Sequence, residues 1–182
     1  MRKLREEGGF GLLELLMAMT MLNIGILALV AAFNSGAIAL QRASRTSTAA
    51  ALADQQMELY RALTYDQISL DTTSLASVDN NYKCDSALGS SCPNSTASLV
   101  QASCSPLTNQ CTPSRTVTGP DHHSYRVDTY VVNYHPIAAS RTIKKVTVVV
   151  RNGLKLGKVL ARETSTFDCS TALPYAPGCP TS

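Results

Sequence analysis

Three groups of residues in this 182-residue chain have types and spacings that could do chemistry. Glu14 is the one ionisable side chain in the 31-residue apolar run from Phe10 to Leu40. His122 and His123 offer ring nitrogens that metals bind. The third group is the set of cysteines, which can form disulfides: Cys84, Cys92, Cys104, Cys111, Cys169 and Cys179.

Metal binding and catalysis find little support in these residues. The two histidines follow a Gly-Pro-Asp turn and have no further ligand cluster beside them, which is typical of a solvated loop. Some side chains could supply oxygen ligands to calcium, but their spacing matches no calcium loop, and residues of these types are common in turns. They are Asp71, Asp79, Asn80, Asn81 and Asp85. The chain has neither a Gly-x-Ser-x-Gly elbow nor a phosphate loop. We therefore expect no metal, no cofactor and no enzymatic activity.

The six cysteines predict disulfides in an oxidising compartment, because their number is even and they are confined to the C-terminal part. Pairing neighbours is the simplest of fifteen connectivities: Cys84 with Cys92, Cys104 with Cys111, and Cys169 with Cys179. Each short loop closed in this way would add about 2–3 kcal/mol of stability. No C-x-x-C spacing occurs, which argues against zinc.

The run from Phe10 to Leu40 is longer than the roughly 20 residues that a helix needs to cross a bilayer. Basic residues lie on both sides of it, so charge alone orients the segment weakly. A secretory signal peptide would have a shorter apolar stretch followed by small residues. Here the apolar stretch starts directly after Gly8-Gly9, so any cleavage must precede it.

Glu7-Gly8-Gly9 followed by Phe10-Gly11-Leu12-Leu13-Glu14 resembles the processing site of type IV prepilins and type II secretion pseudopilins. The resemblance implies a leader of residues 1–9, cleavage after Gly9 by a prepilin peptidase, and methylation of the new N-terminus on Phe10. Glu14 would then be the fifth residue of the mature chain.

Inserting a carboxylate into the membrane as part of a helix costs about 2.5 kcal/mol or more. Glu14 therefore needs either a charged partner or a position that water can reach. The resemblance implies the first: Glu14 neutralises the terminal amine of Phe10 in a neighbouring subunit during assembly. The alternative is that Glu14 sits at the headgroup boundary, where water reaches it.

The helix is expected to continue beyond the membrane, over residues 10–64. Apolar side chains such as Ala49, Leu52 and Tyr60 recur at helical spacing opposite a polar face. The sequence thus predicts a transmembrane half that assembles and an amphipathic half that packs on a sheet.

Residues 65–182 are predicted to form an extracytoplasmic globular domain. The stretch from Thr64 to Pro120 reads as a loop-rich insertion with one short strand, stapled by disulfides. Three alternating segments then predict antiparallel strands: 125–134, 143–151 and 158–167. This part resembles the C-terminal sheet of minor pilins. The expected fold is α+β and pilin-like, a long N-terminal helix packed on a small antiparallel sheet.

The resemblance implies a minor type IV pilin subunit that takes part in pilus assembly, with a type II secretion pseudopilin as the alternative. The insertion suggests another class, a filament-tip adhesin or binding module. The implied partners are the prepilin peptidase and methyltransferase, other pilin or pseudopilin subunits, the inner-membrane assembly platform and membrane lipid. No nucleic acid is predicted, because the basic residues are scattered. The expected location is the bacterial inner membrane, single-pass with the C-terminal domain in the periplasm, and then the filament.

Overall fold

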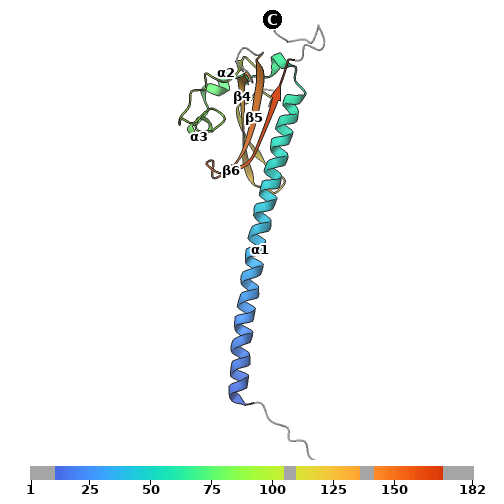
Figure 1. Cartoon of the computed structure of the whole chain (residues 1–182), viewed down its shortest axis with the longest axis vertical. Coiled ribbons are helices and arrows are strands. Elements are labelled where there is room, and N and C mark those ends of the chain that lie inside the picture. The colour runs from blue at the N-terminus through green and yellow to red at the C-terminus, as the bar shows by residue number, and fades with distance from the viewer. Residues whose placement is uncertain (1–10, 105–109, 136–141, 170–182) are drawn as a thin grey trace, which may run out of the picture. The chain divides into compact units, whose positions relative to one another are not determined.

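A computed structural model describes residues 11–104, 110–135 and 142–169. The fold is α+β: the long helix α1, Leu12–Arg61, is followed by short elements and a four-stranded antiparallel sheet (Figure 1). The chain forms two compact units, residues 1–44 and 45–182, and the boundary between them lies inside α1. The amphipathic half of the helix therefore belongs with the sheet on which it packs.

The second half of α1 buries one face. Its buried residues follow the helical spacing expected for an amphipathic helix: Ala49, Leu52, Ala53, Gln56, Met57 and Tyr60. The helix ends at Arg61, slightly before the predicted Thr64, because Thr64 is extended and caps the 3₁₀ helix η1, Tyr65–Gln67. Arg61 lies in the last turn, where a cation interacts favourably with the helix dipole.

The three predicted strands are confirmed within one or two residues as β4, Ser124–Tyr134, β5, Ile143–Asn152, and β6, Val159–Phe167. The sheet has a fourth strand, β3, Ser114–Thr118, in the order β3-β4-β5-β6. The predicted antiparallel meander is therefore confirmed as β4-β5-β6, and β3 adds a further strand from the insertion at its edge. Val117 is the one apolar residue of β3, so the strand depends on pairing with β4 more than on its own pattern.

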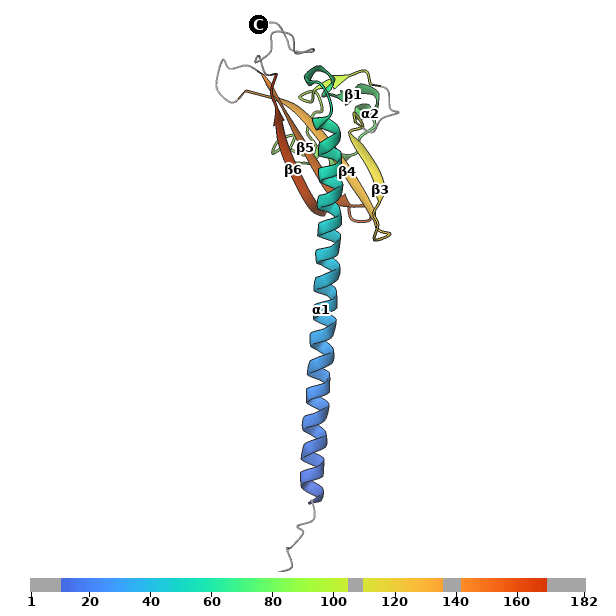
Figure 2. The same ribbon diagram turned by 90° about the vertical axis from the view of Figure 1, so that its right-hand side faces the viewer.

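The strand registers give the sheet two distinct faces. Val127 pairs with Arg115 and Val150, so these three side chains share one face. The part of α1 after Ser44 covers that face (Figure 2). Arg115 Nη2 donates to Gln56 Oε1 at 3.0 Å. Arg126, Asp128 and Tyr130 lie on the opposite face, by the alternation of side chains along a strand.

The segment between α1 and β3 covers this second face. It contains β1, Leu70–Asp71, and β2, Gln101–Ala102, which pair in parallel, and the short helices α2, Thr72–Ala76, and α3, Asn80–Lys83. Tyr82 of α3 is fully buried and stacks on Tyr130 with ring centroids 4.3 Å apart. A backbone hydrogen bond from Val100 to Val131 and a bridge between Leu99 and Val132 also join the segment to β4.

Two disulfides fasten this segment, and both join sequence neighbours as predicted: Cys84 to Cys92 and Cys104 to Cys111. Cys169 is also disulfide-bonded. Its predicted partner, Cys179, lies outside the described residues.

Candidate membrane segment and buried charge network

The first half of α1 exposes apolar side chains all round. From Leu12 to Leu40 every large hydrophobic side chain is between 43% and 82% exposed. Gly25 and Gly36 also face open space. A surface of this kind is not stable in water, so it requires hydrocarbon or other apolar helices around it.

Length and composition allow this helix to cross a membrane. The residues from Leu12 to Leu40 would extend about 43 Å at 1.5 Å per residue, against a hydrocarbon core of about 30 Å. One polar side chain within the segment has a local partner: the hydroxyl of Thr20 donates to the carbonyl of Met17 at 2.8 Å. A backbone bonded within its own helix satisfies the chief requirement for burial in lipid.

Glu14 lies in the first turn of α1 and is exposed there. Its amide donates to the carbonyl of Gly11 at 2.9 Å, and the adjacent helix N-terminus is favourable for a negative charge. Gly9 and Phe10, the predicted cleavage and methylation residues, lie outside the described residues. The pairing of Glu14 with a neighbouring Phe10 therefore stays a prediction.

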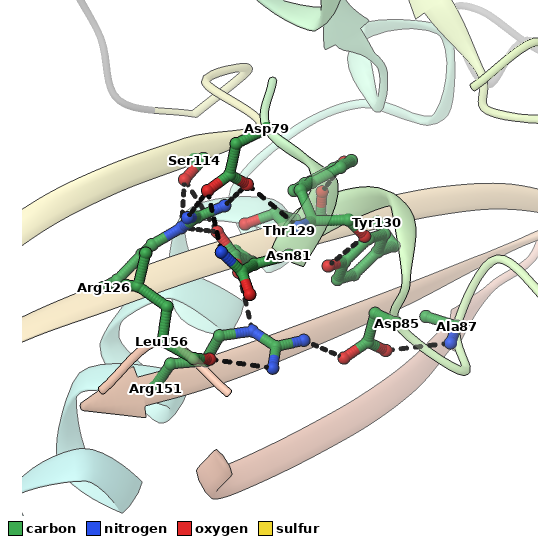
Figure 3. Close-up of polar contacts among 12 residues, drawn as sticks. Asp79, Asn81, Asp85, Ala87, Ser114, Arg126, Thr129, Tyr130, Arg151 and Leu156 are labelled. Atoms are coloured by element: carbon green, nitrogen blue, oxygen red, sulfur yellow. Dashed lines mark hydrogen bonds and ion pairs between the residues drawn. The ribbon is translucent and has the colours of Figure 1, made fainter. Parts of the chain in front are cut away.

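The domain contains a second polar feature, a chain of alternating charges across the covered face of the sheet (Figure 3). Asp128 of β4 is its centre and is completely buried. Arg126 Nε donates to its Oδ1 at 2.7 Å, and Arg151 Nε donates to its Oδ2 at 2.9 Å. The hydroxyl of Ser114 donates to Oδ1 as well, at 2.7 Å.

Two aspartates from the covering segment complete the chain of charges. Asp79 accepts two hydrogen bonds from the guanidinium of Arg126, at 2.6 and 2.7 Å. Asp85 bonds the guanidinium of Arg151 and accepts from Arg162 of β6 at 2.8 Å. Three arginines thus meet three aspartates, and the pairs join the insertion to strands β4, β5 and β6.

The electrostatics of this network favour the charged states of Asp79 and Arg126. Hydrogen bonds from Arg126, opposed by partial burial, hold the pKa of Asp79 well below its usual range. Burial lowers the pKa of Arg126, but its bonds to Asp79 and Asp128 outweigh that effect and leave the pKa raised. Asp79 and Arg126 therefore stay charged at neutral pH, and together with the other ion pairs they form a structural clamp between the insertion and the sheet.

The turn residues considered as calcium ligands have other roles. Asp71 accepts from the amide of Ser74 at 2.8 Å and caps α2, and Asp79 caps α3 through the amide of Tyr82. The two side chains therefore serve as helix N-caps. Asp85 instead belongs to the charge network. His123 Nε2 contacts Arg45 at 2.7 Å, so that nitrogen already has a partner.

Sequence reasoning missed the arginines of the network, Arg126, Arg151 and Arg162. One signal was available: Arg126 and Asp128 stand two apart in the most regular strand, and Arg151 ends a run of valines. This spacing places the charges on one face of the sheet, but it does not distinguish a face covered by charged partners from one covered by water.

Asp128→Asn should lower the free energy of unfolding by about 3–5 kcal/mol, because it leaves two buried guanidinium groups short of a negative partner. Urea unfolding of the detergent-solubilised chain measures this. The matched control is Asp54→Asn, since Asp54 pairs with Arg61 at 3.8 Å on the exposed surface of α1. It should change stability by less than about 0.5 kcal/mol. Equal losses in the two variants would contradict the clamp.

Acid should destabilise the domain partly through Asp79. Its pKa in the folded chain is lower than the roughly 3.9 of an unfolded aspartate, so folding releases protons. The resulting stability is fully present above the unfolded pKa and is lost as pH falls through the folded pKa. Unfolding free energies measured between about pH 5 and 2 should fall more steeply in wild type than in Asp79→Asn, which can still cap α3. Identical slopes would count against this role.

Comparisons with protein-family models, with curated proteins and with solved structures each gave no match.

Proposed function

We propose that this chain is a minor subunit of a type IV pilus-like filament, processed by a prepilin peptidase and N-methylated. The observation that carries the proposal is the exposed apolar half of α1, which continues without a break into a half packed on the sheet. Taken with the leader that resembles a prepilin site, this favours a helix that is first a membrane anchor and then a packing element.

A membrane and a filament interior would both cover the apolar surface of the first half of α1. In the inner membrane, lipid covers the apolar side chains of residues 12–40, and the C-terminal domain lies in the periplasm. In a filament, equivalent helices of other subunits replace the lipid, and small residues such as Gly25 and Gly36 allow close approach. Disulfides in the domain support an oxidising compartment.

A type II secretion pseudopilin is the alternative within the same class, because it shares the leader, the helix and the assembly chemistry. The resemblance of residues 124–167 to the sheet of minor pilins favours the pilus. Assembly on an inner-membrane platform is expected in either case.

A filament-tip binding module is a second candidate, and one feature of the domain favours it. A cavity of about 470 Å³ lies where the insertion meets β3, and its lining is rich in hydroxyl groups: Ser74, Ser77, Thr112, Ser114 and Thr116. Such a site would bind a polar ligand by hydrogen bonds.

The proposal predicts a defined mature N-terminus. The protein isolated from its native host should begin at methylated Phe10, and deletion of the prepilin peptidase should restore residues 1–9. Intact mass and N-terminal peptide mass measure both. An uncut chain in peptidase-positive cells would overturn the proposal and leave a membrane-anchored extracytoplasmic domain.

Glu14→Leu should reduce incorporation into filaments by more than about tenfold while membrane insertion is unchanged. The reason is that the variant leaves the Phe10 amine of a neighbouring subunit as an unpaired charge in apolar surroundings, which costs more than the roughly 1.4 kcal/mol that a factor of ten represents. Quantitative immunoblots of sheared filaments and of membranes give the two values. Thr20→Leu is the control, because it adds a similar apolar side chain without removing a charge. Normal incorporation of Glu14→Leu would refute the pairing with Phe10.

A further inference from the structure

Two turns and one helix residue meet at one end of the sheet. Tyr125 pairs with Asn152, so the turn before β4 and the turn after β5 lie at the same end. Arg45 of α1 joins them through its contact with His123. We define the basal surface as five residues at this end with basic or apolar side chains, of which Arg45 is partly buried and the others are exposed: Arg45, His122, Leu154, Lys155 and Lys158.

The turn that carries Leu154 is held firmly. The side-chain oxygen of Asn152 accepts from the amides of Leu154 and Lys155, at 2.9 and 3.1 Å. Arg151 donates to the carbonyl of Leu156 at 3.2 Å. Gly153 lies so close to Ser124 that a Cβ would be 2.4 Å from its hydroxyl.

Leu154 is nevertheless 90% exposed, more than any other large hydrophobic residue described. A rigid turn that holds a leucine in solvent loses the stability that burial of the side chain would give. The side chain is therefore placed to be covered by something outside the domain.

The charge around Leu154 is positive. Within the described ranges no ion pair joins Arg45, Lys155 or Lys158 to a carboxylate. Asp121 is the acidic group of the neighbouring turn, and it already accepts from the Tyr125 hydroxyl and the His123 amide.

A depression of about 310 Å³ lies among these groups. It is lined by Arg45, His122, His123, Ser124, Asn152 and Leu154. Arginine, imidazole and hydroxyl donors together suit a phosphate group.

Chain connectivity limits what can cover this surface. Leu40 ends the apolar half of α1, and four residues separate it from Arg45. Even a fully extended link of that length spans only about 18 Å. Arg45 and the turns beside it therefore remain close to the headgroup layer whenever the apolar segment is in a bilayer, whatever the angle between the two units.

We propose that the basal surface binds the anionic headgroup layer of the membrane that holds the N-terminal helix, with Leu154 entering the interface. The inference rests on the membrane anchorage in the proposed function. Phosphate groups pair with Arg45, Lys155 and Lys158, and the leucine leaves water for the boundary of the acyl chains.

The chain contains no tryptophan, so single tryptophans report membrane contact without background. Full-length variants Leu154→Trp, Ser98→Trp and Phe33→Trp are reconstituted in bilayers of phosphatidylcholine alone or with 30% phosphatidylglycerol, each with brominated acyl chains. Ser98 is an exposed residue of the insertion, and Phe33 lies in the apolar half of α1. Bromine quenching of each tryptophan is measured.

Phe33→Trp should be quenched in both bilayers. Leu154→Trp should be quenched at least threefold more than Ser98→Trp in the anionic bilayer, and about as little as Ser98→Trp in phosphatidylcholine. Adding Lys155→Gln and Lys158→Gln should at least halve the quenching at Leu154→Trp, whereas Lys83→Gln in α3 should leave it unchanged.

Three results would overturn the proposal. If Leu154→Trp is quenched no more than Ser98→Trp in the anionic bilayer, the basal surface does not bind lipid, and the anchorage stands. Equal quenching of Leu154→Trp in both bilayers removes the role of anionic headgroups. If Phe33→Trp itself is unquenched, the anchorage fails and the basal surface has no membrane to bind.

Discussion

The central strands β4 and β5 are buried on both faces, and the rest of the domain follows from that constraint. A sheet that is buried on both faces needs a layer of other elements packed on each face. The amphipathic half of α1 supplies one, with Ala49, Met57 and Tyr60 in the apolar core. The insertion supplies the other, although it is short of apolar residues and has little regular structure of its own.

Because the insertion has few apolar residues, it is attached to the sheet by other interactions than α1 is. The helix is held by packing of apolar side chains, which is non-directional and tolerates small shifts. The insertion is held by paired charges, by the stacked rings of Tyr82 and Tyr130, and by disulfides between near neighbours. Paired charges give little net stability when buried, but their hydrogen bonds require a defined geometry, so they orient the insertion on the sheet.

The long helix joins two chemical environments. Before Leu40 its side chains suit hydrocarbon, and after Ser44 they suit the core of a protein. The change takes place over a few residues that include Arg42 and Arg45, which are suited to the headgroup region of a bilayer. If the chain is the filament subunit proposed above, it would leave the membrane for the filament without refolding its domain, because the surface that changes partners is confined to the apolar half.

The sequence by itself determined the features that depend on local pattern and spacing. We could predict the apolar run of 31 residues, its amphipathic continuation, three alternating strands and two close cysteine pairs. Each of these features depends on the types and spacing of residues that are near one another in the sequence. The processing residues Gly9 and Phe10 and the role of Glu14 remain predictions, since they concern an enzyme and a second subunit. Only the tertiary structure decided that β3 joins the sheet and that Asp79 and Asp85 meet Arg126, Arg151 and Arg162. Those partners lie tens of residues apart, and a charge shows no sign of its partner until folding removes the water between them.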